Sequence, residues 1–225
     1  MEDTISYKIE KSLMLPYEFA IENDFMREYE ASNQTVASSR IYFICIVRKP
    51  GIISKMLSNT SKFPEVLYIG ETFNKTKRFE RHDKLLKATR RLNRFNNIGV
   101  CFLNVRYSYI GSPLWTKDPY HIFDELKDLH SKTAILLLER LYIRLFRPIL
   151  NKETLSHKLY DDKQIRQKLI LNGIRYIHLD IGMNEDEHKY WSPELKSTSD
   201  WHYFDLKTGD MHVGMPDLFS IKRST

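Results

Sequence analysis

A glutamate lies in the middle of a strongly apolar helical stretch. The segment Ser131–Phe146 is predicted to form a helix, and Glu139 lies there among leucines, isoleucines and aromatic residues that leave almost no polar face. A helix that is apolar all round belongs to a core. A carboxylate in a core is costly unless a cation, hydrogen-bond donors or a metal ion compensate its charge. Two interpretations stay open: Glu139 is a functional ligand, or Glu139 and Arg140 mark the solvent edge of the helix.

Upstream of this helix, a set of four residues carries side chains that can move protons or hold a phosphate. Tyr42 lies in one apolar, strand-like run, and Tyr68 lies near the end of the next, just before Gly70. Arg78 and His82 follow four residues apart, a spacing that places two side chains on one face of a helix. Taken singly, the tyrosines are typical of strand packing, and Arg78 and His82 are typical of a solvated helix. Their order and spacing together favour a shared functional site more strongly than any one of these residues does alone.

Basic residues are concentrated in one segment of the chain. Residues 75–94 hold nine Lys or Arg and two acidic residues, which gives +7, so the remaining residues sum to −1 in a chain of net charge +6. Such a segment is typical of a contact surface for a polyanion, although a charge run alone also suits a solvated helix. The residues expected to contact nucleic acid are Lys75, Arg81, Arg90, Arg91 and Arg94.

In order and spacing, these residues resemble the GIY-YIG nuclease family. The segment Tyr68–His82 carries Tyr, Gly, Arg and His at the family's spacing. Further on, the segment Leu138–Ile143, which contains the glutamate, is followed by Arg147–Asn151 (Arg-Pro-Ile-Leu-Asn), as in the family's last motif. The resemblance covers residues 40–151. Five matching sequence features in the family's order make the resemblance more specific than any single feature would.

The resemblance implies hydrolysis of phosphodiester bonds in DNA with Mg²⁺ or Mn²⁺ as cofactor. Glu139 would be the protein ligand of the metal ion, which suits Mg²⁺ because that ion keeps several waters and is often held by one or two carboxylates. Arg78 would hold the scissile phosphate with its planar guanidinium. Tyr68 would take a proton from the attacking water. Since an unperturbed tyrosine has a pKa of roughly 10, the metal ion and the cationic helix would have to favour its ionised form.

Three further residues complete the site that the resemblance implies. Tyr42 would orient the attacking water or share the role of base. His82 would assist proton transfer or form a hydrogen bond to Tyr42. Asn151 would hold the site together from below.

The sequence departs from the family pattern at two places. Arg40 stands where the first motif usually has glycine, which affects the local backbone more than the chemistry because Tyr42 is retained. An insertion, residues 48–65, replaces the usual short hairpin. Restriction endonucleases of the family carry such additions, so we expect a defence or restriction-type enzyme.

Other functions stay open at this point. One alternative is a nucleic-acid-binding protein of the same fold without cleavage activity, and another is a repair or structure-specific nuclease. A third is a protein-interaction module whose basic helix binds an acidic partner. A homodimer is expected if the enzyme cuts palindromic DNA.

The elements that must position these residues predict an α/β (α+β) fold. Strands are expected at 41–47, 66–69 and 98–110, forming a small antiparallel sheet. The basic helix, from Thr72 or Asn74 to about Leu92, and the Glu139 helix are expected to flank this sheet. The remaining expected elements are a helical segment at 17–29, a loop at 32–39, helices at 121–130 and 161–172, a strand at 174–181 and a hairpin at 200–213.

Composition and length limit the classes of protein to which the chain can belong. The chain has 225 residues, 42% of them hydrophobic, which is enough for a packed core and excludes global disorder. We divide it into an N-terminal extension (1–39), a nuclease-like core (40–151) and a C-terminal accessory region (152–225). No apolar run is long enough to cross a bilayer, and the start of the chain lacks a secretory signal pattern. We therefore expect a soluble cytoplasmic protein in which Cys45 and Cys101 are buried thiols.

Overall fold

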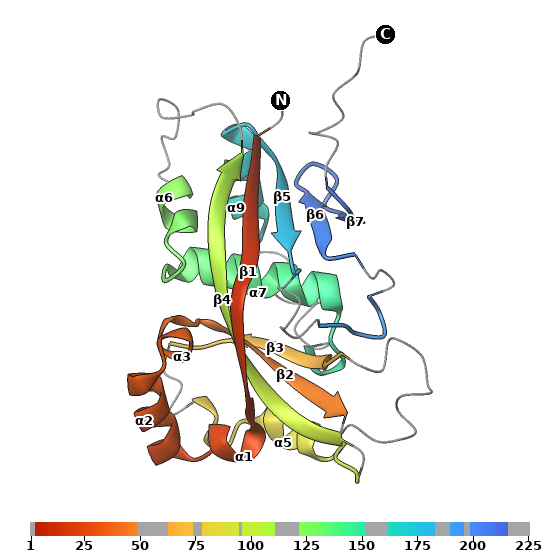
Figure 1. The fold of residues 1–225 in the computed structure, drawn as a ribbon. Coiled ribbons are helices and arrows are strands. Elements are labelled where there is room, and N and C mark those ends of the chain that lie inside the picture. The colour runs from red at the N-terminus through yellow and green to blue at the C-terminus, as the bar shows by residue number, and fades with distance from the viewer. Residues whose placement is uncertain are drawn as a thin grey trace.

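The computed structural model describes residues 3–48, 63–73, 78–94, 96–110, 122–151, 162–182, 190–195 and 199–215. It is a mixed α/β structure built on one seven-stranded sheet, which confirms the predicted fold class (Figure 1). In chain order the elements are β1 (Asp3–Pro16), α1 (Tyr17–Ala20), α2 (Asn23–Ser32), α3 (Gln34–Ser38), β2 (Ile41–Arg48), β3 (Glu65–Glu71), α5 (Asp83–Thr89), β4 (Asn96–Ile110), α6 (Ile122–Lys127), α7 (Lys132–Phe146), the 3-10 helix η2 (Ile149–Asn151), α9 (Asp162–Leu171), β5 (Ile174–Asp180), β6 (Trp201–Asp205) and β7 (Met211–Val213).

The three strands predicted for the sheet are neighbours and antiparallel, but they form only one end of it. The strand order is β3-β2-β4-β1-β5-β6-β7. The fourth strand in this order, β1, comes from the segment that we took for an N-terminal extension. It pairs antiparallel with β4 and parallel with β5, so it joins the two halves of the sheet. The predicted hairpin at 200–213 is formed by β6 and β7.

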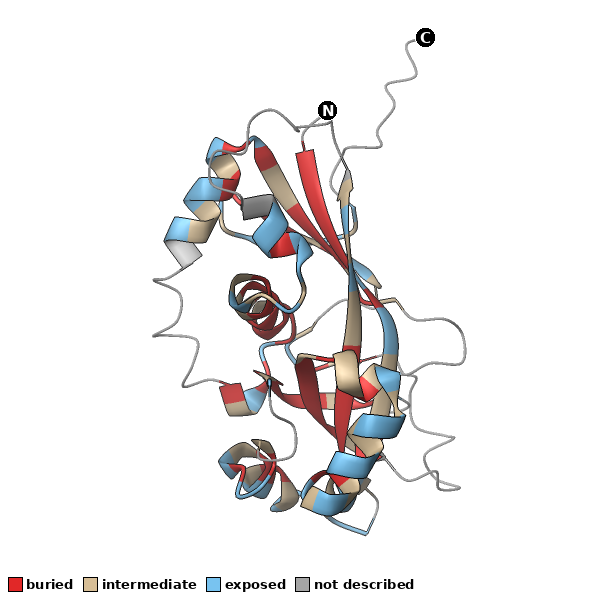
Figure 2. Ribbon diagram, turned by 90° about the vertical axis from the view of Figure 1, so that its left-hand side faces the viewer, coloured by how far each residue is buried: buried red, intermediate tan, exposed pale blue. Residues whose placement is uncertain are grey.

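Helices cover both faces of the sheet. One face packs against α6, α7 and α9, with Leu126, Leu169 and much of α7 in the same buried cluster as Ile5 and Tyr7 of β1. Figure 2 shows these three helices on one side of the strands. On the other face, residues of β2, β3 and β4 form a second cluster with α1, α2, α3 and α5. Successive residues of a strand point to opposite faces, so Tyr42 and Tyr68 belong to the second cluster and Phe43 and Ile69 to the first.

The helix that carries Glu139 has the limits that the sequence predicts. The Ser131 hydroxyl accepts a hydrogen bond from the backbone N–H of Ala134 (3.1 Å), so Ser131 is the N-cap of α7. At the other end Arg147 adopts a left-handed conformation (φ 46°), and Pro148 follows. A residue in this conformation cannot continue a helix. The result is a 15-residue helix with ten buried residues, Glu139 among them.

Of two predictions about the N-terminal segment, the loop was wrong and the helical segment was confirmed with one break. Residues 32–39 do not form a loop, because Asn33 caps the short helix α3 by accepting a hydrogen bond from the N–H of Val36. The helical segment at 17–29 is interrupted after Ala20, and α2 begins at Asn23. Most of the insertion 48–65 lies outside the described residues. Cys45 and Cys101 are buried free thiols, as expected, and within the described ranges no helix has the length and apolar character needed to span a membrane.

Candidate active site

The chain turns between Arg78 and His82, so the two residues do not share a helix face. Arg81 has a left-handed backbone (φ 54°), which interrupts helical geometry. A new helix, α5, begins at Asp83 with His82 as its N-cap: His82 Nδ1 accepts a hydrogen bond from the N–H of Leu85 (3.1 Å). The prediction of one continuous basic helix as far as about Leu92 was therefore wrong.

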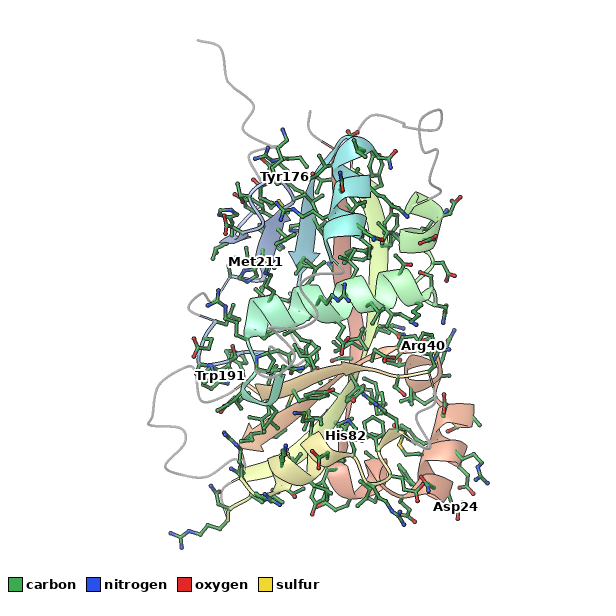
Figure 3. All side chains as sticks on the ribbon, turned by 180° about the vertical axis from the view of Figure 1, so that it is seen from behind. Asp24, Arg40, His82, Tyr176, Trp191 and Met211 are labelled. Carbon is green, nitrogen blue, oxygen red and sulfur yellow. The ribbon has the colours of Figure 1, made fainter. Side chains whose placement is uncertain are left out.

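Despite this turn, Arg78 and His82 both reach the hydroxyl group of Tyr42. The Tyr42 oxygen lies 2.8 Å from His82 Nε2 and accepts a hydrogen bond from Arg78 Nε at 3.1 Å. Tyr42 is fully buried, whereas Tyr68 and His82 are each 9% exposed. In Figure 3 His82 lies below α7, in the half of the molecule that contains β2 and β3. The turn, rather than helical spacing, brings the predicted residues together.

The hydrogen bonds of His82 fix where its proton lies. Burial and the charge of Arg78 lower the pKa of His82 to about 4, so the ring is neutral at pH 7. Its Nδ1 accepts from Leu85, which places the single ring proton on Nε2. His82 and Arg78 therefore both donate to the Tyr42 oxygen, and the hydroxyl proton of Tyr42 is free to point elsewhere. It is donated to Tyr68, in a hydrogen bond that favours ionisation of Tyr68 and disfavours that of Tyr42.

The two tyrosines differ in how readily they ionise. Burial raises the pKa of Tyr42 well above its usual value, and the neighbouring Tyr68 raises it further. Burial also raises the pKa of Tyr68, with the negative charge of Glu139 as the next cause, while Arg78 and the hydrogen bond from Tyr42 lower it. The expected role of Tyr68 as a base needs a pKa below the usual range of tyrosine. The positive charge of the basic segment does not by itself lower the pKa of Tyr68 that far.

Glu139 lies close enough to Tyr68 to affect its ionisation, although the two residues come from different elements. It is 4% exposed on α7. Within the described residues no group of three or more His, Cys, Asp or Glu side chains could hold a metal ion. Glu139 could therefore contribute one carboxylate to a bound cation but not a cage made entirely of protein ligands.

Sequence reasoning missed one acidic residue near the site. The charge of Glu71, the last residue of β3, affects the pKa of both Tyr68 and Arg78. Glu71 directly follows Gly70, so its position one residue beyond the tyrosine-glycine motif was the available signal. It is a second carboxylate beside the guanidinium that we expect to hold a phosphate.

Asn151 holds the outer strand of the sheet in place. Its Oδ1 accepts a hydrogen bond from the backbone N–H of Ile69 (2.8 Å), and its Nδ2 donates to the Ile69 carbonyl (2.9 Å). Asn151 is 1% exposed at the end of η2. Since β3 is an edge strand, these two bonds take the place of a neighbouring strand next to Tyr68. The predicted role of Asn151 as a support of the site agrees with this position.

The predicted nucleic-acid contacts that the structure describes lie on the surface around α5. Arg81, Arg90, Arg91 and Arg94 are all exposed, and Lys75 lies outside the described residues. Arg81 precedes α5 and the other three follow it, so the basic side chains are arranged at both ends of a short helix.

No family model, no curated protein and no solved structure matches the chain. Its site is therefore characterised by geometry alone: two tyrosines, an arginine and a neutral histidine joined by hydrogen bonds, with a buried carboxylate nearby.

Proposed function

We propose that the protein is a DNA endonuclease of the GIY-YIG type that hydrolyses phosphodiester bonds with Mg²⁺ or Mn²⁺. The observation that carries the proposal is the meeting of Arg78, His82 and Tyr68 at the Tyr42 hydroxyl, from separate segments of the chain. Hydrolysis of a phosphodiester requires an activated water and stabilisation of charge on the phosphate. This arrangement offers groups for both tasks.

In this proposal Tyr68 is the base that removes a proton from the attacking water. Tyr42 supports it, because Tyr42 donates its own hydroxyl proton to Tyr68 and is held in that orientation by His82 and Arg78. Arg78 Nε contacts Tyr42, which leaves its terminal nitrogens for a phosphate oxygen. His82 fixes the direction of the hydrogen bonds and does not itself take the first proton, because its Nε2 already carries one.

Glu139 would hold the metal ion together with water and substrate oxygens. A bound divalent ion supplies positive charge to the phosphate and lowers the pKa of nearby groups. At Glu139 that charge would offset the negative charge that raises the pKa of Tyr68. Burial, the larger cause of the raised pKa of Tyr68, would remain, so the metal ion would have to lower that pKa against it.

The exposed arginines around α5 suit contact with the DNA backbone. We propose a defence or restriction-type role for the protein, by analogy with GIY-YIG restriction enzymes that carry additions to the core. A homodimer would follow if the substrate sequence is palindromic.

The test compares cleavage of plasmid and short duplex DNA by the wild type and by Glu139→Gln, with Mg²⁺ and with EDTA, at one low ionic strength. We expect cleavage that requires the metal ion and falls by about 100-fold or more in Glu139→Gln. Glu125→Gln, at an exposed position on α6, is the matched control and should cleave as the wild type does.

Other results would point to other functions. DNA binding without cleavage on any substrate would support a non-catalytic nucleic-acid-binding protein. Cleavage of branched or damaged DNA in preference to plain duplex would support a repair or structure-specific nuclease. Cleavage by Glu139→Gln at the wild-type rate would refute the assigned metal ligand.

A further inference from the structure

A cavity of about 210 Å³ lies between α7 and the face of the sheet opposite to the tyrosines of the candidate active site. Its volume is that of about seven water molecules at a share of about 30 Å³ each. Pockets that hold drug-sized ligands begin near about 300 Å³. The cavity therefore suits a ligand of one ring system rather than a larger molecule.

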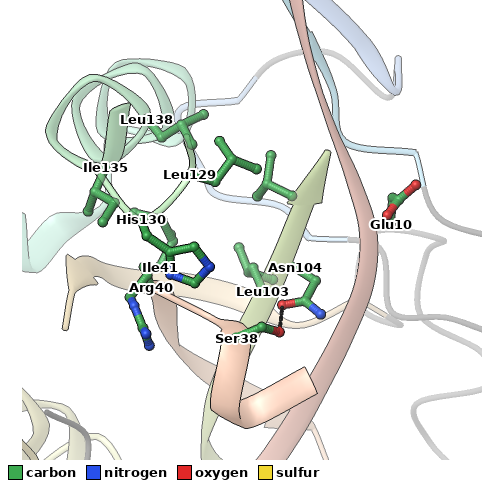
Figure 4. Close-up of a pocket in the computed structure, with 11 residues that line it drawn as sticks. Glu10, Ser38, Arg40, Ile41, Leu103, Asn104, Leu129, His130, Ile135 and Leu138 are labelled. Atoms are coloured by element: carbon green, nitrogen blue, oxygen red, sulfur yellow. Dashed lines mark hydrogen bonds between the residues drawn. The ribbon is translucent and has the colours of Figure 1, made fainter. Parts of the chain in front are cut away.

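Aliphatic side chains form opposite sides of this cavity. Ile135 and Leu138 project from α7, and Ile41 and Leu103 come from β2 and β4 (Figure 4). Each of the four is at most 2% exposed and belongs to the packed core, whereas Glu10 and His130 are exposed at the outer side of the cavity. Two aliphatic walls suit a flat ring, because both faces of the ring can contact carbon.

A polar pair lies across the cavity from α7. The Ser38 hydroxyl lies 2.9 Å from Asn104 Oδ1 and 2.7 Å from the Gln34 carbonyl oxygen, and its single proton can be donated to only one of them (Figure 4). The carboxamide of Asn104 lines the cavity and can offer a donor or an acceptor to a ligand. Amide side chains recognise the neighbouring donor and acceptor groups on the edge of a nucleobase. One polar edge between apolar walls is thus the arrangement that a heterocyclic base needs.

The charges at the cavity edge suit a phosphate group attached to such a ring. Arg40 lines the cavity, and its Nη1 donates to the carbonyl oxygens of Ala37 and Ser39, which hold the guanidinium in place. Among the lining residues Glu10 is the one carboxylate, and it already forms an ion pair with Arg106 at 3.1 Å.

Two elements carry residues of both the cavity and the candidate active site. Arg40 comes two residues before Tyr42, and Leu138 comes one residue before Glu139. Arg40 also lies over the ring of Phe73 at 6.0 Å, and Phe73 is 53% exposed just beyond the end of β3. An exposed aromatic ring at this place offers a stacking surface beside Arg40.

We propose that this cavity binds a single unpaired nucleobase. The same chemistry occurs in a base displaced from a DNA substrate and in a free nucleoside or nucleotide. The DNA source rests on the proposed nuclease function, since a base can be unstacked there at a cost of a few kcal/mol. The nucleoside source does not depend on that function.

The first experiment titrates adenosine, guanosine, cytidine and thymidine into the ¹⁵N-labelled protein. At least one nucleoside should shift the backbone amide signals of Ile41, Leu103 and Ile135. Asn104→Leu, which removes the polar edge but keeps the volume, should weaken this binding by about tenfold or more. Asn97→Leu, at an exposed position on the same strand, is the control and should bind as the wild type does.

The second experiment separates the two sources of the base. A duplex that contains 2-aminopurine is mixed with the protein in EDTA, so that the DNA stays intact. A rise in fluorescence with the wild type and with Asn97→Leu, but not with Asn104→Leu, would assign the cavity to a base from DNA. Nucleoside binding without that rise would assign it to a free nucleoside or nucleotide, even if the protein cleaves no DNA. Absence of both signals, with the fold intact by NMR, would overturn the proposal.

Discussion

Gly70 lies directly opposite Tyr42 on the neighbouring strand, and the ring of Tyr42 occupies the space that a side chain at position 70 would need. A Cβ atom built on Gly70 would lie 2.6 Å from the Tyr42 hydroxyl oxygen and 2.7 Å from Tyr68 Cε1. These distances are too short for atoms that do not bond. Gly70 is thus needed for the close approach of two tyrosines and not for a turn.

Replacing Gly70 by alanine should therefore displace the Tyr42 hydroxyl from Arg78 and His82. We expect loss of most cleavage activity and a decrease of about 1–3 kcal/mol in the free energy of unfolding, typical of overpacking. Gly99→Ala is the matched control, since its Cβ would meet only the flexible Met14 side chain within 3 Å. Urea unfolding and cleavage assays on both variants check this. Equal activity in the two variants would contradict it.

The effect of Glu139 on Tyr68 can be measured without any cleavage. Because the negative charge of Glu139 raises the pKa of Tyr68, Glu139→Gln should lower that pKa in EDTA. A divalent ion should lower it in the wild type and leave it unchanged in Glu139→Gln. NMR titration of ¹³Cζ-labelled tyrosine, with the Tyr68 signal assigned from Tyr68→Phe, gives the values. An identical pKa in the wild type and Glu139→Gln would exclude electrostatic coupling between these residues.

His82 should make stability depend on pH below neutrality. Its pKa is lowered to about 4 in the folded protein, from 6.5, so the unfolded chain binds more protons between these pH values. The free energy of unfolding should therefore fall as the pH falls from about 6.5 to about 4, and this contribution is intact above 6.5. His82→Asn can still cap α5, but its side chain does not titrate.

The difference between the wild type and His82→Asn isolates this contribution. Urea unfolding at pH 4, 5, 6 and 7 should give a flatter dependence for the variant. His178 and His202, whose pKa values are also lowered by burial, are present in both proteins and cancel. Exposed His212→Asn serves as the control and should keep the wild-type slope. Parallel curves for the wild type and His82→Asn would rule out the assigned protonation behaviour.

The exposed arginines after α5 should contribute to DNA affinity through the phosphates. Replacing Arg90 and Arg91 together by glutamine should weaken binding for all sequences alike. It should also reduce the slope of log K against log salt concentration by about 0.9 for each phosphate that the variant no longer neutralises. Arg27→Gln, at an exposed position on α2, is the control. Fluorescence anisotropy at several salt concentrations measures the slopes. Unchanged slopes would show that Arg90 and Arg91 do not contact the DNA phosphates.

Sequence patterns predicted the elements whose signals are local. The strands that carry Tyr42 and Tyr68 and the helix from Ser131 follow from apolar runs and a capping serine, and the structure confirms them. The turn at Arg81 has no such signal, because arginine rarely adopts a positive φ and histidine is not among the preferred N-caps. The structure brings Tyr42, Arg78 and His82 together all the same, by a backbone path that their spacing did not indicate.

The N-terminal strand shows a second limit of sequence patterns. From Thr4 to Ile9 polar and apolar residues alternate, which is the period of a strand. Charged residues follow at once, so the local pattern does not single out a central strand, and we expected only an N-terminal extension here. Its central position depends on pairing with β4 and β5, and such distant pairings cannot be read from a local window.

The pairing of β1 also determines when the sheet can form during synthesis of the chain. This strand leaves the ribosome before both of its neighbours, which are synthesised much later: Thr4 pairs with Ile110 on one side and with Tyr176 on the other. Until residues 174–180 have emerged, one edge of β1 has no strand to bind. Contacts this distant along the chain make folding slow. The sheet can therefore close only after synthesis of most of the chain, and a protein truncated before β5 would expose the edge of its own central strand to aggregation.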